Sequence, residues 1–203
     1  LTYGLSDCIE TAAYLNLAKP NGRDLQYTGS KFRVRGSLFD QGQLPVDLGW
    51  YIELDYHHVS QFDDQKLELR PIIQRDFGSF SLMLNPIFEK VPAGQEIRFA
   101  FGYASSVYYR WLRSLSPGIE FFGGIGNLND IEPRAEQQHY FFPVGRGELP
   151  HRIESNVGAG FGLTRDSDPV ILKFNLQVEK FIGAIFGPSS GSSTSCTARL
   201  FSD

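Results

Sequence analysis

Apolar residues recur at every second position along most of this 203-residue chain. The clearest run lies between Ile97 and Trp111, where Phe99 and Phe101 fall on one side while Arg98 and Arg110 fall on the other. Because successive side chains of a β-strand point to opposite faces, a period of two indicates strands rather than helices. The chain therefore predicts strands with one strongly apolar face and one polar face.

Eleven segments repeat this alternation, and several of them contain ten residues or more. They lie near residues 1–5, 9–18, 26–38, 44–57, 65–75, 79–90, 97–111, 115–126, 138–146, 152–163 and 170–182. Ten residues rise ~3.3 Å each, and with a tilt of ~40° they cover about 25 Å, the height of the apolar band of an outer-membrane barrel. The segments therefore have the length that a membrane-crossing strand needs.

The connections between these segments alternate in length and polarity. Short turns are predicted at residues 6–7, 40–43, 76–78, 112–114 and 147–150, and longer polar connections at 19–24, 58–64, 91–96, 127–137 and 164–169. Outer-membrane barrels have short periplasmic turns and longer outside loops, and bacterial single-chain barrels have an even number of strands. We therefore predict an all-β fold, a transmembrane antiparallel up-and-down β-barrel in a bacterial outer membrane. About eleven strands are visible and about twelve are expected in the complete protein, whose N-terminal strand would precede Leu1.

Charged residues occupy the polar side of these segments, seven of them basic and seven acidic. Lipid cannot accept such side chains, so we expect them to line the lumen and to pair with one another. The predicted lumen-lining residues are Glu10, Lys31, Arg33, Arg35, Glu53, Asp55, Glu68, Arg70, Arg98, Arg110, Glu120, Glu154, Lys173 and Glu179.

Lys31, Arg33 and Arg35 form a basic stripe on one predicted strand. A basic stripe in a lumen can guide anionic solutes. It can also pair with carboxylates on the neighbouring strands, which is the interpretation we favour. The carboxylates available for that pairing are those of Glu10, Glu53 and Asp55.

We expect the barrel domain to span residues 1–186 and a flexible Ser/Gly-rich tail to span 187–203. The chain contains only two cysteines, Cys8 after a short turn and Cys196 in the tail. Both belong to the predicted periplasmic side, where the environment is oxidising and a disulfide is chemically allowed. Two unpaired thiols are the alternative.

Composition excludes several other classes of protein. The net charge of −4 gives no basic patch for a nucleic-acid partner. No stretch approaches 18 consecutive apolar residues, as a membrane-spanning helix would require. Two cysteines are too few for a disulfide-rich scaffold or a Cys-based zinc site.

Possible catalytic chemistry is confined to one predicted loop. His57 and His58 precede Ser60 and Asp63, which are the residue types of a hydrolase triad, and His57 with Asp55 could contact a metal ion. Polar loops contain such residues routinely, so we predict no catalytic residue, no metal and no cofactor. The glycine-rich run 158–162 is not a dinucleotide motif, because a strand pattern continues through it where a helix would be needed.

Several strand phrases resemble a known family. They are Leu-Pro-Val-Asp-Leu-Gly-Trp-Tyr-Ile-Glu-Leu-Asp-Tyr from Leu44, Arg-Asp-Phe-Gly-Ser-Phe-Ser-Leu-Met-Leu-Asn from Arg75, Leu-Ser-Pro-Gly-Ile-Glu-Phe-Phe-Gly from Leu115 and Val-Gly-Ala-Gly-Phe-Gly-Leu-Thr from Val157. Together they resemble bacterial outer-membrane barrels of the phenol-degradation meta-pathway transporter type, over most of residues 26–182. The resemblance implies an outer-membrane barrel and passage of small molecules, and it implies no catalytic residue.

Three functions are compatible with these patterns. The leading expectation is a channel or facilitator for small solutes, with the lipid bilayer and those solutes as partners. The alternatives are a scaffold barrel that holds a protein partner or a complex at the outer membrane, and an outer-membrane lipid-modifying enzyme. A soluble β-sandwich or a lipocalin-like protein is the alternative to all three.

Overall fold

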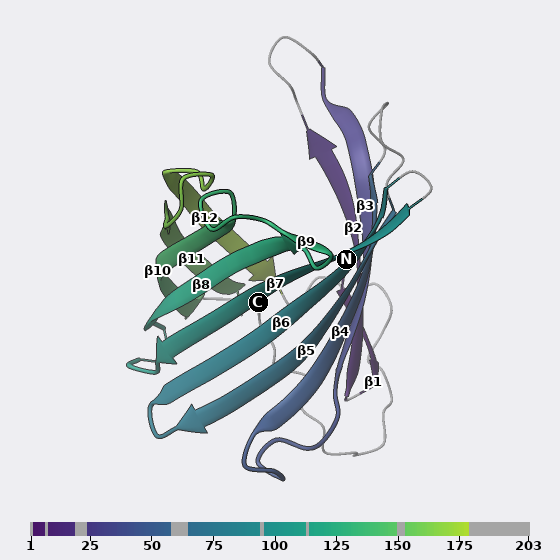
Figure 1. The fold of residues 1–203 in the computed structure, drawn as a ribbon. Helices are drawn as coiled ribbons and strands as arrows, with labels where there is room; N and C mark the ends of the chain where they lie inside the picture. The colour runs from purple at the N-terminus through teal and green to yellow at the C-terminus, as the bar shows by residue number, and fades with distance from the viewer. Residues whose placement is uncertain are drawn as a thin grey trace.

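A computed structural model describes residues 2–6, 8–18, 24–57, 65–93, 96–112, 114–149 and 153–178 of the chain. They form one sheet of twelve antiparallel strands (Figure 1). The strands are β1 (Thr2–Ser6), β2 (Ile9–Ala18), β3 (Gln26–Ser37), β4 (Asp47–His57), β5 (Gln65–Phe77), β6 (Phe80–Ala93), β7 (Glu96–Tyr109), β8 (Ser116–Asn127), β9 (Asp130–Ile131), β10 (Gln138–Leu149), β11 (Ile153–Gly162) and β12 (Val170–Val178). These residues contain no helix, and hence no apolar helix long enough to cross a membrane.

Each strand pairs with the next along the chain, except that β8 pairs with β10 and the two-residue β9 folds back onto β8. The expected all-β, antiparallel, up-and-down fold is therefore confirmed. The eleven strands of the main path coincide with the eleven segments of period-two alternation, with small shifts at their ends. Among the described residues, β1 and β12 are not paired with each other, so the sheet is open along these two edges.

The sheet is strongly curved, and Figure 1 shows β10–β12 curling round from the plane of β4–β7. Side chains from strands that are not neighbours meet on one face. Asn156 of β11 and Lys173 of β12 both lie 2.8 Å from the carboxylate of Glu120 on β8. Only the concave face of a curved sheet brings such side chains together, so we call the face that carries Glu120 the inner face, and its reverse the outer face.

The two faces have opposite polarity. On the inner face Arg35 and Glu53 are only 4% and 7% exposed, whereas on the outer face Leu82 and Phe99 are 41% and 50% exposed. No large side chain among the described residues is fully buried. The described residues therefore form only small buried apolar clusters, and the polar side of their alternation is the protected one.

Glycines in β8 and β11 make room for aromatic rings on the inner face. A Cβ atom on Gly160 would lie 2.2 Å from the Phe142 ring, and one on Gly118 would lie 2.4 Å from the Tyr108 ring. Such distances are far below van der Waals contact, so each ring occupies space that a side chain on the neighbouring strand would need. These contacts support a cluster of Tyr108, Phe142 and Val144.

Three details of the strand prediction are wrong. β4 begins at Asp47 and not at residue 44, because Gly42 at φ 77° donates its N–H to the Asp47 carboxylate and holds residues 38–46 in a loop. The predicted loop at 91–96 is mostly strand, since β6 and β7 keep their register as far as Ala93 and Glu96. The third is β9, which lies inside the predicted loop 127–137. With two residues, this strand is too short to show alternation.

Some predictions concern residues outside the described ranges. These are Glu179, Cys196, the tail 187–203 and the loop residues His58, Ser60 and Asp63. The Cys8–Cys196 disulfide and the flexible tail therefore stay predictions.

Candidate functional site: the polar inner face

Strand register places the charged residues of β3–β6 in rows across the inner face. One row runs Arg33, Glu53, Glu68 and Glu89 from β3 to β6, each directly opposite the next. Like charges directly opposite one another are destabilising, so three neighbouring carboxylates need cations beside them. The neighbouring rows supply those cations.

Glu10 of β2 holds the first two cations. Its carboxylate lies 3.0 Å from Nη2 of Arg33 and 3.0 Å from Nε of Arg35, and Arg35 is its direct register partner. Both guanidinium groups are buried. One carboxylate thus links β2 to two successive inner-face residues of β3.

Lys31 continues the pairing toward the opposite end of β3. Its ammonium lies 2.9 Å from Asp55 and 3.2 Å from Glu53, both of which are buried on β4. Together with the two arginines on Glu10, these contacts confirm the predicted pairing of the basic stripe with Glu10, Glu53 and Asp55. The stripe is therefore part of a charge network in which each of its cations is paired with a carboxylate, which we call the closed charge network.

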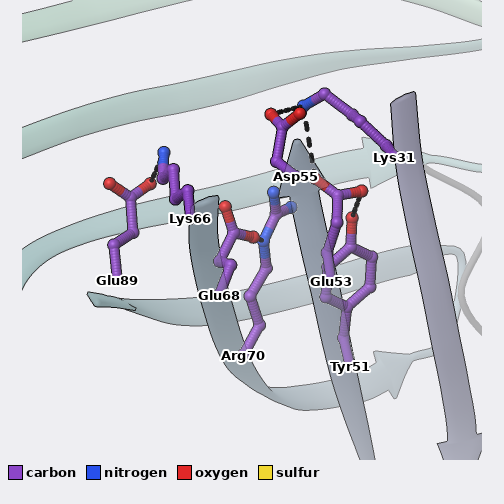
Figure 2. Close-up of polar contacts among 8 residues, drawn as sticks. All are labelled: Lys31, Tyr51, Glu53, Asp55, Lys66, Glu68, Arg70 and Glu89. Carbon is purple, nitrogen blue, oxygen red and sulfur yellow. Dashed lines mark hydrogen bonds and ion pairs between the residues drawn. The ribbon is translucent and has the colours of Figure 1, made fainter. Parts of the chain in front are cut away.

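The network extends into β5 and β6 (Figure 2). Arg70 forms an ion pair with Glu68, and Lys66 lies 2.6 Å from Glu89. The Tyr51 hydroxyl donates to Glu53 at 2.6 Å, and the Arg70 guanidinium lies 4.5 Å from the centre of the Tyr51 ring. Each carboxylate of the glutamate row therefore has a hydrogen-bond donor or a cation close to it.

Glu120 organises a second polar group, on β7–β12. Its carboxylate accepts hydrogen bonds from the Tyr108 hydroxyl, from Asn156 Nδ2 at 2.8 Å and from Lys173 Nζ at 2.8 Å. Glu120 is only 4% exposed. A single buried carboxylate thus connects β7, β8, β11 and β12.

The remaining predicted lumen residues lie near the edges of this face. Arg98 is exposed near the start of β7, and Glu154 is half-buried on β11 opposite Glu148. Arg110 lies just beyond the end of β7, where it is exposed and pairs with Asp76 at 2.5 Å. These three residues stand apart from the two buried groups.

Several residues of the inner face are not among the predicted lumen-lining residues. Tyr51, Tyr108 and Asn156 are buried in the polar groups, and Lys66 with Glu89 extends the ion pairs. All five lie on the polar side of the alternation of their strands, which is the signal that could have found them. Charge alone does not identify Tyr51, Tyr108 or Asn156, whereas Lys66 and Glu89 are charged and could have been predicted from the same alternation.

The described side chains form no cluster of metal ligands. No group of three or more His, Cys, Asp and Glu residues there could hold a metal ion. Asp55, which the alternative metal site would use, is bound to Lys31. The inner face therefore offers charge, hydrogen bonds and aromatic surface.

Comparison of the chain with protein-family models, with curated proteins and with solved structures finds no match.

Proposed function

We propose that the chain forms the wall of a bacterial outer-membrane barrel and lets small solutes pass along its inner face. The observation that carries the proposal is the inverted polarity of the sheet: charge and hydrogen-bonding groups on the concave face, and exposed leucine and phenylalanine on the convex face. Exposed apolar surface of this extent calls for lipid or a protein to cover it. A concave polar wall is suited to water and dissolved solutes.

Two further features support a membrane wall. The strands of the main path other than β1 have nine to fourteen residues, which is the length that a tilted strand needs to cross the hydrocarbon core. Exposed aromatics also lie at strand ends, as with Phe80 and Tyr109, whose ring centres are 5.0 Å apart where β6 begins and β7 ends. Aromatic girdles at the lipid–water boundary have this placement.

The first test is extraction and insertion. The full chain should leave the membrane fraction only with detergent and should migrate differently on a gel before and after heating. A protein that dissolves without detergent would contradict the membrane proposal and favour a soluble sandwich or a lipocalin-like protein.

The second test is conductance in planar bilayers, with two adjacent positions of β12 as a matched pair. Asn175 lies on the inner side opposite the buried Asn156, whereas Phe174 is exposed on the outer side. Asn175→Trp should lower the unit conductance because it adds bulk to the water path, and Phe174→Tyr should leave it unchanged. Inserted, heat-modifiable protein without conductance would contradict the channel.

A scaffold barrel is the second candidate, and the closed charge network of β2–β6 favours it. Its ion pairs brace the wall and leave little charge for a passing ion. A scaffold should co-purify with one partner at fixed stoichiometry and should not conduct.

A further inference from the structure

The inner face contains a small cavity between its two polar groups. The cavity has a volume of about 110 Å³ and is lined from β5, β6, β7, β8 and β12. Residues from its wall that matter for binding are Arg70, Asn85, Ala104, Ser106, Phe122 and Lys173. For scale, an apolar protein cavity of about 150 Å³ accepts a benzene molecule. The space therefore suits a molecule of only a few heavy atoms.

Two polar side-chain atoms in the wall of this cavity have no hydrogen-bond partner among the described residues. They are the Oγ atom of Ser106 and the Oδ1 atom of Asn85. Asn85 lies opposite Ala104 and Ser106 lies opposite Met83, so the two residues are diagonal neighbours, two register positions apart on the inner face. Ser106 is 6% exposed. Leaving a buried hydroxyl and a buried amide oxygen unsatisfied is costly, so a bound molecule that donates hydrogen bonds would be stabilised here.

The cations of the cavity are already neutralised. Arg70 is paired with Glu68, and Lys173 lies 2.8 Å from Glu120. A charged ligand would have to compete with these carboxylates, whereas a neutral ligand would leave both pairs intact. Met83, Ala104 and Phe122 add apolar surface beside the polar groups.

We propose that this cavity binds a small neutral solute that carries hydroxyl groups, such as a short polyol. The solute donates a hydrogen bond to Asn85 Oδ1, exchanges one with Ser106 Oγ and packs its carbon atoms on Phe122. The inference rests on the proposed function, since it names the class of solute that the channel wall would hold.

The test uses full-length protein in detergent micelles and glycerol as the probe, with binding followed by ligand-observed NMR saturation transfer. Asn85→Leu and Ser106→Ala should each weaken glycerol binding about tenfold, the value of one good hydrogen bond. Ala104→Leu should abolish binding because it fills the cavity. Ser81→Ala is the matched control, because Ser81 lies on the same face of β6 outside the cavity, and it should bind glycerol as the wild type does.

Acetate and methylammonium serve as charged comparators of similar size. Equal or tighter binding of either ion, or unchanged glycerol binding in both polar variants, would overturn the proposal. Each variant is first checked for the wild-type gel shift on heating, so that misfolding is not read as lost binding. Glycerol binding in micelles is measured independently of conductance in bilayers. Protein that binds glycerol but does not conduct would therefore contradict only the channel, and protein that conducts but does not bind glycerol would contradict only this site.

Discussion

The inner face has two halves that hold their strands together in different ways. In the charged half, β2–β6, ion pairs join strands that are already neighbours in the sheet, as with Glu10 and Arg35 or Lys31 and Asp55. In the aromatic half, β7–β12, Glu120 joins strands that are not neighbours. The first half therefore stabilises pairing and register, and the second stabilises curvature.

The chemistry of each half fits its role. Side chains of adjacent strands meet at about 5 Å, a distance that lysine, arginine and glutamate span without bending the sheet. Contacts from β8 to β12 must pass over β10 and β11, and on β11 an added Cβ atom would lie 2.5 Å from Val144 at Gly158 and 2.2 Å from the Phe142 ring at Gly160. Charge is distributed over many pairs in one half and concentrated on a single carboxylate in the other.

The largest expected effect is therefore at Glu120. Glu120→Ala removes the acceptor of Tyr108, Asn156 and Lys173, and it should lower the free energy of unfolding by about 3–5 kcal/mol, the range for a broken buried ion pair. Urea titration of protein folded into lipid vesicles measures this value. Glu120→Gln is the control, because its amide oxygen still accepts hydrogen bonds, and it should cost less. A loss below about 1 kcal/mol for Glu120→Ala would remove the distinction between the halves.

The outer face should behave alike in both halves if lipid covers all of it. Leu82→Arg in β6 and Phe121→Arg in β8 should each cost about 2–4 kcal/mol of folding free energy in bilayers. Both residues point outward and are exposed. Ala100→Ser, on the inner side of β7, should change stability by less than about 0.5 kcal/mol. Small, equal effects of all three substitutions would contradict lipid contact.

Glycines that leave space for aromatic rings should be important for stability in the aromatic half. Gly160→Ala places a Cβ atom 2.2 Å from the Phe142 ring and should cost about 1–3 kcal/mol, as overpacking does. Gly145→Ala is the matched control, since the nearest atom to its added Cβ would be Leu115 Cδ1 at 3.6 Å. Comparing the two unfolding free energies separates close packing from the general effect of replacing glycine. Equal costs would show that ring packing is not the cause.

The smallest expected effect is in the charged half. Glu10→Gln should cost about 1 kcal/mol, because the amide oxygen of Gln still accepts a hydrogen bond from the buried arginines and Arg33 still has Glu53 as its register partner. A double-mutant cycle of Glu10→Gln with Arg35→Gln gives the pair energy. Raising the salt to 1 M should change that energy little, because salt screens a buried pair much less than an exposed one. Asp130→Asn, exposed on β9, is the control with no expected change. A loss as large as that of Glu120→Ala would contradict distributed charge.

Period-two alternation was sufficient to predict the number, order and approximate bounds of the long strands, and it assigned Arg33, Glu53 and Glu120 to one face. Alternation works because strand geometry imposes the same period wherever the sheet lies. It did not predict β9, which is a pairing of only two residues, or the start of β4, which depends on the Gly42–Asp47 hydrogen bond. Neither feature produces a periodic pattern in the sequence.

The sequence by itself thus determined which side chains share a face and which strands are neighbours, since both follow from local geometry and chain order. Only the tertiary structure decided that Lys173 reaches Glu120, that Phe142 lies over Gly160 and that Ser106 borders a cavity with Lys173. These contacts depend on how far the sheet curves. Curvature is the sum of small twists over many strands and of the side-chain volumes packed on the concave side, and no single segment encodes it.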